Sequence, residues 1–159
     1  MKKVIKIVVI ILLAAFAVLQ FFQIDKSGLP IVQAETIEAS VAVPPDVALI
    51  LGRSCNDCHT NATIYPWYSY IQPAGWFLDD HIDAGRRHLN FSVFNTYEPK
   101  KKAHKLEEIC EMVESKEMPL PSYLWIHWDA VLKDTEAKAL CDWANEERAK
   151  ILQSGIIAD

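Results

Sequence analysis

The sequence has only 5 glycines in 159 residues and no glycine-rich phosphate loop, so it gives no support for nucleotide binding. No alternation of apolar and polar residues is long enough to indicate a half-buried strand. Basic clusters are absent apart from residues 100–102, and a net charge of −5 at pH 7 argues against nucleic-acid binding. Neither a Ser-His-Asp set nor a pair of carboxylates stands out, so hydrolytic chemistry is not predicted.

The first residues differ from the rest of the chain. Three lysines within the first six positions precede an apolar run that reaches Ile24. Positive charge ahead of an apolar segment is typical of a segment whose continuation leaves the cytoplasm. A run of about 20 apolar residues can span a bilayer, so residues 1–24 are predicted to form a transmembrane helix or signal anchor. A cleaved signal peptide with its site at 32–34 is the alternative. Either way, we expect the rest of the chain in the periplasm, at the inner membrane of a bacterium.

The remainder is expected to be a linker followed by one small domain. Residues 25–45 hold prolines and scattered small or polar residues without periodicity, which predicts a linker. Residues 46–153 are enough for one domain with its own core. Apolar residues recur there at helical spacing, which predicts an all-α domain. Its main helices are expected to begin near Asp46, to span 74–88, to span 101–116, and to begin near Asp134.

The run Cys55-Asn56-Asp57-Cys58-His59 is the most specific chemical signal in the sequence. Two cysteines at this spacing can each form a thioether with a haem vinyl group, and the histidine that follows can bind the iron. The run therefore predicts one covalently attached haem c per chain, held by Cys55 and Cys58. His59 is the predicted proximal ligand. Export fits this prediction, because haem c is attached on the outer side of the membrane.

Other roles for the cysteines have less support. A thioredoxin-like dithiol needs a preceding strand in a βαβ unit, and a zinc site needs a second pair of ligands; neither is visible. A disulfide between Cys55 and Cys58 would be strained at so short a spacing. Cys110 and Cys141 face inward on two predicted helices, and in an oxidising compartment they are expected to form a disulfide. Two buried free thiols are the alternative.

The second axial ligand of the iron is not fixed by this motif. Met118 lies in a Met-Pro loop where an extended segment could present its thioether, a soft ligand that favours ferrous iron and raises the potential. His81 and His88 share one side of the predicted helix over 74–88 and are alternative ligands. An open or water-bound position is the third possibility, and it would suit a haem-based sensor or a peroxidase-like enzyme. A Met118-ligated protein would be an electron carrier, not an enzyme.

Further motifs follow in a fixed order. They are Asn61-x-Thr63, Pro66-Trp67-Tyr68-Ser69, Gly85-Arg86-x-His88-Leu89-Asn90-Phe91-Ser92 and Glu117-Met118-Pro119-Leu120-Pro121-Ser122-Tyr123. With the haem motif, this series resembles the bacterial haem-binding domain family related to cytochrome c, over about residues 46–150. The resemblance implies a small cytochrome c-like fold around one haem, with His59 as proximal and Met118 as distal ligand. His127-Trp128 departs from the His-Pro expected there.

The prediction from the sequence is thus a membrane-tethered periplasmic monohaem c-type cytochrome. Its haem iron, ligated by His59 and Met118, would transfer electrons. Redox partner proteins in or near the same membrane are the expected partners, and a tether of some twenty residues would give the domain reach toward them.

Overall fold

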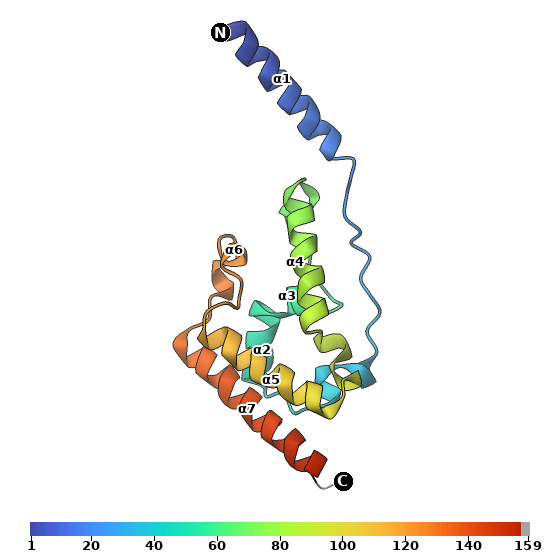
Figure 1. Cartoon of the computed structure of the whole chain (residues 1–159), viewed down its shortest axis with the longest axis vertical. Helices are drawn as coiled ribbons and strands as arrows, with labels where there is room; N and C mark the ends of the chain where they lie inside the picture. Colours follow the sequence, from blue (N-terminus) through green and yellow to red (C-terminus); the bar gives the residue numbers. More distant parts are fainter. Residues whose placement is uncertain (157–159) are drawn as a thin grey trace.

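In the computed structural model, which describes residues 1–156, every regular element is a helix (Figure 1). The α-helices are α1 (Lys2–Leu19), α2 (Pro45–Ser54), α3 (Asn56–His59), α4 (Ala74–His88), α5 (Pro99–Glu114), α6 (Pro121–Leu124) and α7 (Asp134–Ile156). Five 3-10 helices lie between them: η1 (Gln33–Glu35), η2 (Ile37–Ala39), η3 (Trp67–Tyr70), η4 (Phe91–Thr96) and η5 (Trp128–Ala130). The prediction of an all-α chain is confirmed.

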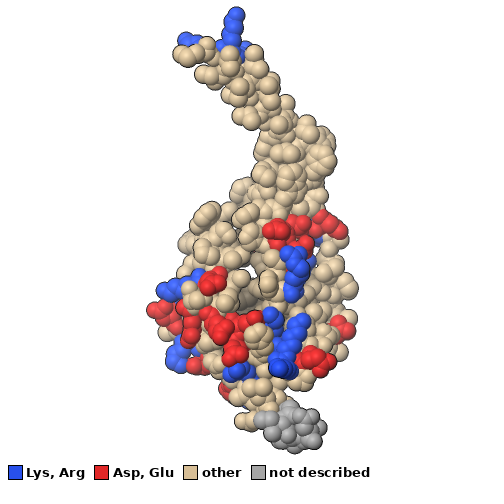
Figure 2. All heavy atoms as spheres, viewed as in Figure 1, with Lys and Arg blue, Asp and Glu red and all other residues tan. Residues whose placement is uncertain are grey.

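The prediction of a transmembrane helix over residues 1–24 is wrong. Across residues 1–156, no helix combines the length and the apolar character needed to cross a membrane. α1 ends at Leu19, and its first turns contain three lysines, which Figure 2 shows as the only charged part of that helix. The apolar stretch from Ile7 to Leu19 spans only about 20 Å at 1.5 Å per residue, against a hydrocarbon layer of about 30 Å.

Helix ends follow local chemistry. α4 has the bounds predicted for it, and it directly follows Pro73. α5 begins two residues earlier than predicted because Pro99 occupies its first turn, where a missing N–H costs no hydrogen bond. α5 ends in a Schellman motif, in which the N–H groups of Lys116 and Glu117 donate to the carbonyls of Val113 and Met112. Lys116 is left-handed there, with φ of 60°.

The core lies where α5 and α7 pack along each other and against α2 and η4. Its fully buried side chains include Phe94, Leu106 and Leu140. Ile37 and Val41, from the segment 25–45, are also buried in this core. The disulfide predicted between Cys110 and Cys141 is confirmed, and it joins α5 to α7.

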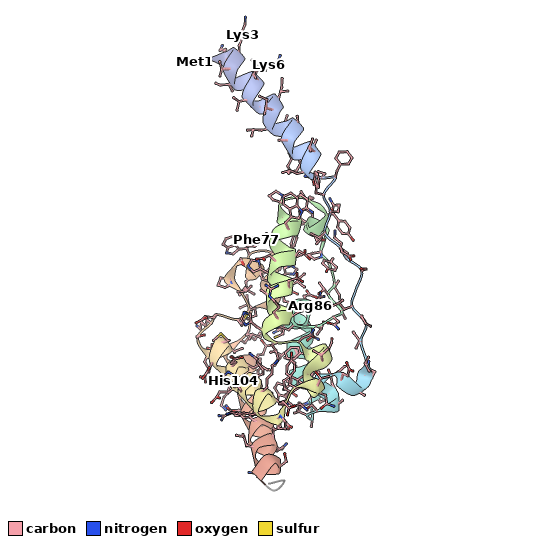
Figure 3. The ribbon with its side chains drawn as sticks, turned by 45° about the vertical axis from the view of Figure 1, so that its right-hand side comes forward. Met1, Lys3, Lys6, Phe77, Arg86 and His104 are labelled. Carbon is pink, nitrogen blue, oxygen red and sulfur yellow. A yellow bond between two sulfur atoms is a disulfide. The ribbon has the colours of Figure 1, made fainter. Side chains whose placement is uncertain are left out.

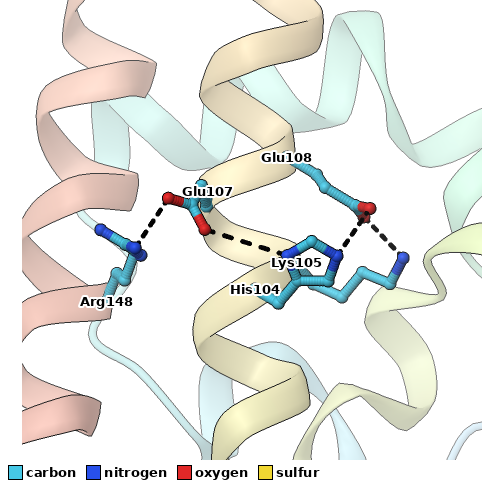
Figure 4. A network of polar contacts seen from close by, with 5 residues as sticks. All are labelled: His104, Lys105, Glu107, Glu108 and Arg148. Atoms are coloured by element: carbon cyan, nitrogen blue, oxygen red, sulfur yellow. Dashed lines mark hydrogen bonds and ion pairs between the residues drawn. The ribbon is translucent and has the colours of Figure 1, made fainter.

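An ion pair between Arg148 and Glu107 reinforces the packing of α7 against α5 at the surface. Figure 4 shows Arg148 of α7 beside Glu107 of α5, and His104 beside Glu108 within α5. The Arg148–Glu107 distance is 2.7 Å, and His104 lies 3.1 Å from a carboxylate oxygen of Glu108. The His104 side chain is 61% exposed, so this histidine belongs to the surface.

Arg53 joins α2 to α7. Its guanidinium donates to both carboxylate oxygens of Glu136 at 2.9 Å, and the Lys133 N–H donates to one of them. The Arg53 hydrogen bonds, followed by that of Lys133, lower the pKa of Glu136 from 4.5 to about 2. Cys55 directly follows α2. The Arg53–Glu136 pair therefore holds the end of α2 that leads into the haem motif against α7.

Glu136→Gln is expected to lower the free energy of unfolding by about 1 kcal/mol at neutral pH, since a charge-assisted pair becomes a weaker hydrogen bond. A carboxylate with a depressed folded pKa stabilises above its unfolded pKa and loses that contribution as the pH falls toward the folded value. The wild-type and variant free energies should therefore converge between pH 4.5 and about 2. Urea unfolding across this pH range measures the difference. If the free energies of unfolding of the wild type and Glu136→Gln still differ at pH 2 as much as at neutral pH, the stabilisation does not come from the ionised carboxylate of Glu136.

Candidate haem site

The two cysteines and the histidine of the haem motif line one cavity of about 410 Å³. That volume lies in the usual range of about 300–1,000 Å³ for small-molecule sites. The cavity is walled by α2, α3, α4 and α5 and by the segment between α5 and α6. In Figure 2 the surface is hollowed between α4 and α6. Most lining residues are apolar. Residues of the lining that can bind or contact a haem include Cys55, Cys58, His59, His81, Gly85, His88, Met112, Met118 and Tyr123.

His59 is oriented by a backbone hydrogen bond. Its Nδ1 lies 2.9 Å from the Leu89 carbonyl oxygen. A carbonyl can only accept, so Nδ1 carries the proton and Nε2 keeps its lone pair for a metal. Burial lowers the pKa of His59, which keeps the ring neutral, although the Leu89 hydrogen bond opposes this shift. These are the properties required of an iron ligand.

A buried polar cluster holds the Leu89 carbonyl in place. The Asn90 side chain donates to the amide oxygen of Asn61, and its own oxygen accepts the Ser92 N–H. The Ser92 hydroxyl in turn accepts the Asn61 N–H. All three side chains are buried, so each hydrogen bond spares a polar group from being buried unpaired. The sequence places these residues in motifs but does not show that they support His59.

Cys55 and Cys58 are free thiols. Burial, followed by the charge of Cys58, raises the pKa of Cys55 to about 12. Burial, followed by the charge of Asp57, raises the pKa of Cys58 to about 11. Both groups are therefore protonated thiols at neutral pH. A short break in the helix at Cys55, with φ of −129°, separates α2 from α3 and turns both thiols toward the cavity.

Gly85 lets α4 pack directly against the motif. A Cβ at this position would lie 2.7 Å from the Cys58 carbonyl oxygen and 3.2 Å from its Cβ. Gly85→Ala is expected to lower the free energy of unfolding by about 1–3 kcal/mol, the range for overpacking, and to reduce the haem content of the purified protein. Chemical unfolding and absorbance per chain measure both effects.

Gly52 provides a matched control for that substitution. It lies in α2, and a Cβ there would meet nothing within 4 Å. Gly52→Ala should raise the free energy of unfolding by about 0.5–1 kcal/mol, because alanine loses less backbone entropy in a helix. If Gly85→Ala and Gly52→Ala change the free energy of unfolding equally, the close contact of Gly85 with Cys58 does not exclude a larger side chain.

Two thioethers and two further imidazoles share the cavity with His59, those of Met118, Met112, His81 and His88. The structure therefore brings the predicted ligand Met118 and both histidine alternatives to the same cavity. His81 Nδ1 lies 2.7 Å from the Phe77 carbonyl oxygen, which leaves its Nε2 free in the same way as that of His59. Met112 lies two residues before the end of α5 and also lines the cavity.

Arg86 of α4 binds the loop that follows the haem motif. Arg86 donates to the Thr60 carbonyl and to the Thr63 hydroxyl, both at 2.9 Å. It thus fastens the loop after the haem motif to α4, on which Figure 3 labels it together with Phe77.

A second, smaller cavity of about 230 Å³ shares Cys58, His81 and Tyr123 with the first, and aromatic rings form much of its wall.

The residues present fit a haem. Two free thiols, a neutral histidine with an available Nε2 and several soft or imidazole donors face one largely apolar space. Such a combination defines a haem-binding site in an all-helical domain. The chain belongs to the haem-binding domain family, whose pattern matches residues 14–146.

The chain is also similar to a larger curated protein. It is 26% identical over 106 residues to the cytochrome c peroxidase Ccp of Escherichia coli (strain K12). The similarity covers 64% of this chain but only 23% of that protein, so the chain spans about a quarter of its relative's length. No solved structure matches the chain.

Proposed function

We propose that this protein is a periplasmic monohaem c-type cytochrome that transfers electrons, with haem attached to Cys55 and Cys58. The main support for this function is that one cavity is lined by both free thiols, by His59 with its free Nε2 and by the thioether of Met118. Bound haem supplies an iron that accepts and releases one electron. His59 and Met118 are the proposed axial ligands, a pair that raises the reduction potential.

The protein's own residues perform three tasks in this proposal. The two thiols fix the haem in one orientation, and His59 binds the iron in the tautomer that Leu89 selects. The apolar wall keeps water from the iron, which favours the less charged ferrous state. The Cys110–Cys141 disulfide supports an oxidising compartment such as the periplasm, and redox proteins there are the proposed partners.

A peroxidase-like enzyme is the second candidate, favoured by the similarity to the Escherichia coli peroxidase. Such an enzyme needs an iron face that peroxide can reach, whereas a carrier needs both faces ligated. A haem-based sensor would share the open face with the peroxidase.

Redox potentiometry together with a peroxide assay separates these functions. For a carrier, the haem-loaded protein should titrate reversibly as a single one-electron centre and reduce peroxide no faster than its Met118→Ala variant. Turnover of peroxide that is higher in the wild type than in that variant would refute the carrier and support the enzyme. Carbon monoxide binding to the ferrous wild-type protein without turnover of peroxide would point to a sensor.

A further inference from the structure

Tyr123 connects the segment that carries Met118 to the haem motif itself. Its hydroxyl donates to a carboxylate oxygen of Asp57 at 2.9 Å. Asp57 lies between the two cysteines in α3, whereas Tyr123 lies in α6, which begins three residues after Met118. This hydrogen bond therefore spans the cavity wall from the haem-attachment side to the side of the proposed distal ligand.

The ring of Tyr123 is held on its face as well as at its hydroxyl. It stacks on His127 with ring centroids 4.1 Å apart and planes within 6°. His127 Nε2 lies 2.8 Å from the hydroxyl of Tyr68, a residue of η3. Burial, followed by the charge of Asp57, raises the pKa of Tyr123, so the phenol remains a hydrogen-bond donor at neutral pH.

The segment between Met118 and Tyr123 has few other fixed points. At its start, the N–H groups of Glu117 and Met118 both donate to the Met112 carbonyl at 3.0 Å. Pro119 and Pro121 have no N–H to donate. The position of this segment therefore depends on its two ends: the C-terminus of α5 and Tyr123.

We propose that Tyr123 is a positioning residue for Met118, and that its hydrogen bond to Asp57 latches the segment 118–123 against the haem-attachment helix. When the latch is lost, Met118 leaves the iron more often and the sixth position opens to external ligands. This inference rests on the proposed ligation of iron by Met118.

The binding of imidazole to the ferric, haem-loaded full chain tests the latch. The apparent dissociation constant of an external ligand is inversely proportional to the fraction of open sites, so binding tightens as more sites open. Tyr123→Phe keeps the stacked ring but removes the hydroxyl, and it should tighten imidazole binding about tenfold, the effect of losing one hydrogen bond to a charged group. Met118→Ala sets the limit for a permanently open site, and absorbance reports binding.

Two further variants make the test specific. Tyr68→Phe removes the other hydroxyl of the same cluster, which contacts His127 and not Asp57, and it should change imidazole binding less than about twofold. Asp57→Ala breaks the latch from its other end, so it keeps the test possible if Tyr123→Phe does not fold. Asp57→Ala also removes the longer hydrogen bond from the Ile64 N–H, at 3.4 Å, which Tyr123→Phe leaves in place. In the double variant, the effects of Asp57→Ala and Tyr123→Phe on imidazole binding should not add, because both remove the bond between Tyr123 and Asp57.

Each outcome has one meaning. Tight imidazole binding by Met118→Ala, with Tyr123→Phe and Asp57→Ala unchanged from wild type, overturns the latch and leaves Met118 as the ligand. Additive effects in the double variant overturn the pairing of Tyr123 with Asp57. If Met118→Ala itself binds imidazole no more tightly than the wild type, both the ligation by Met118 and the latch are rejected.

Discussion

Replacement of His59 by glycine is expected to abolish the low-spin haem spectrum and to lower the yield of haem-loaded protein at least about tenfold, as the loss of groups at metal centres does. His59 has the only imidazole that directly follows the two thiols in the chain, and the Leu89 carbonyl holds its Nε2 ready for the iron. No other ligand atom is fixed in this way on α3.

Added imidazole should restore the low-spin spectrum of His59→Gly, since it can occupy the space left by the ring. The control is His104→Ala, because His104 is an exposed histidine of α5 that does not line the cavity. That variant should retain the wild-type spectrum and haem content. An unchanged spectrum in His59→Gly would show that the iron has a different proximal ligand.

Met118→Ala is expected to lower the reduction potential by at least about 0.1 V, within the roughly 0.8 V range over which axial ligands set haem potentials. A thioether stabilises the ferrous state, so its loss favours the ferric form. The charge-transfer absorption of sulfur-ligated ferric haem should disappear, and the ferrous variant should bind carbon monoxide. Potentiometry and absorbance spectroscopy measure all three effects.

Met112 supplies the control and His81 is the competing ligand, because both line the same cavity as Met118. Met112→Ala should leave the potential within about 0.03 V and keep the charge-transfer band, since a change in packing alone is a small part of the range set by ligands. If His81→Ala removes the low-spin spectrum while Met118→Ala preserves it, His81 is the distal ligand. The free Nε2 of His81 makes this the alternative that the experiment has to exclude.

The sequence predicts those parts of the structure that local chemistry determines. Proline positions and apolar periodicity predict α4 with its observed bounds, and they predict the inward direction of Cys110 and Cys141 on α5 and α7. The spacing of Cys55, Cys58 and His59 predicts that all three serve one site, and they line one cavity.

Contacts between distant segments leave no such pattern. The carbonyl that orients His59 belongs to Leu89, thirty positions later, and the partner of Asp57 is Tyr123, at a separation of 66. No periodicity encodes which backbone oxygen or carboxylate a side chain meets across a loop. Counting apolar residues also overestimated the N-terminal apolar helix, because the three lysines lie within its first turns and not ahead of it, and because the helix ends at Leu19.

Covalent attachment of haem to Cys55 and Cys58 is the central claim, and the intact mass of the denatured chain tests it most directly. The protein would be expressed together with a c-type haem maturation system, alongside a variant with serine at both cysteine positions. We expect the wild-type chain to carry the added mass of one haem after denaturation, and the variant to have its unmodified mass. A wild-type chain that binds haem when folded but has its unmodified mass when denatured would contradict the claim.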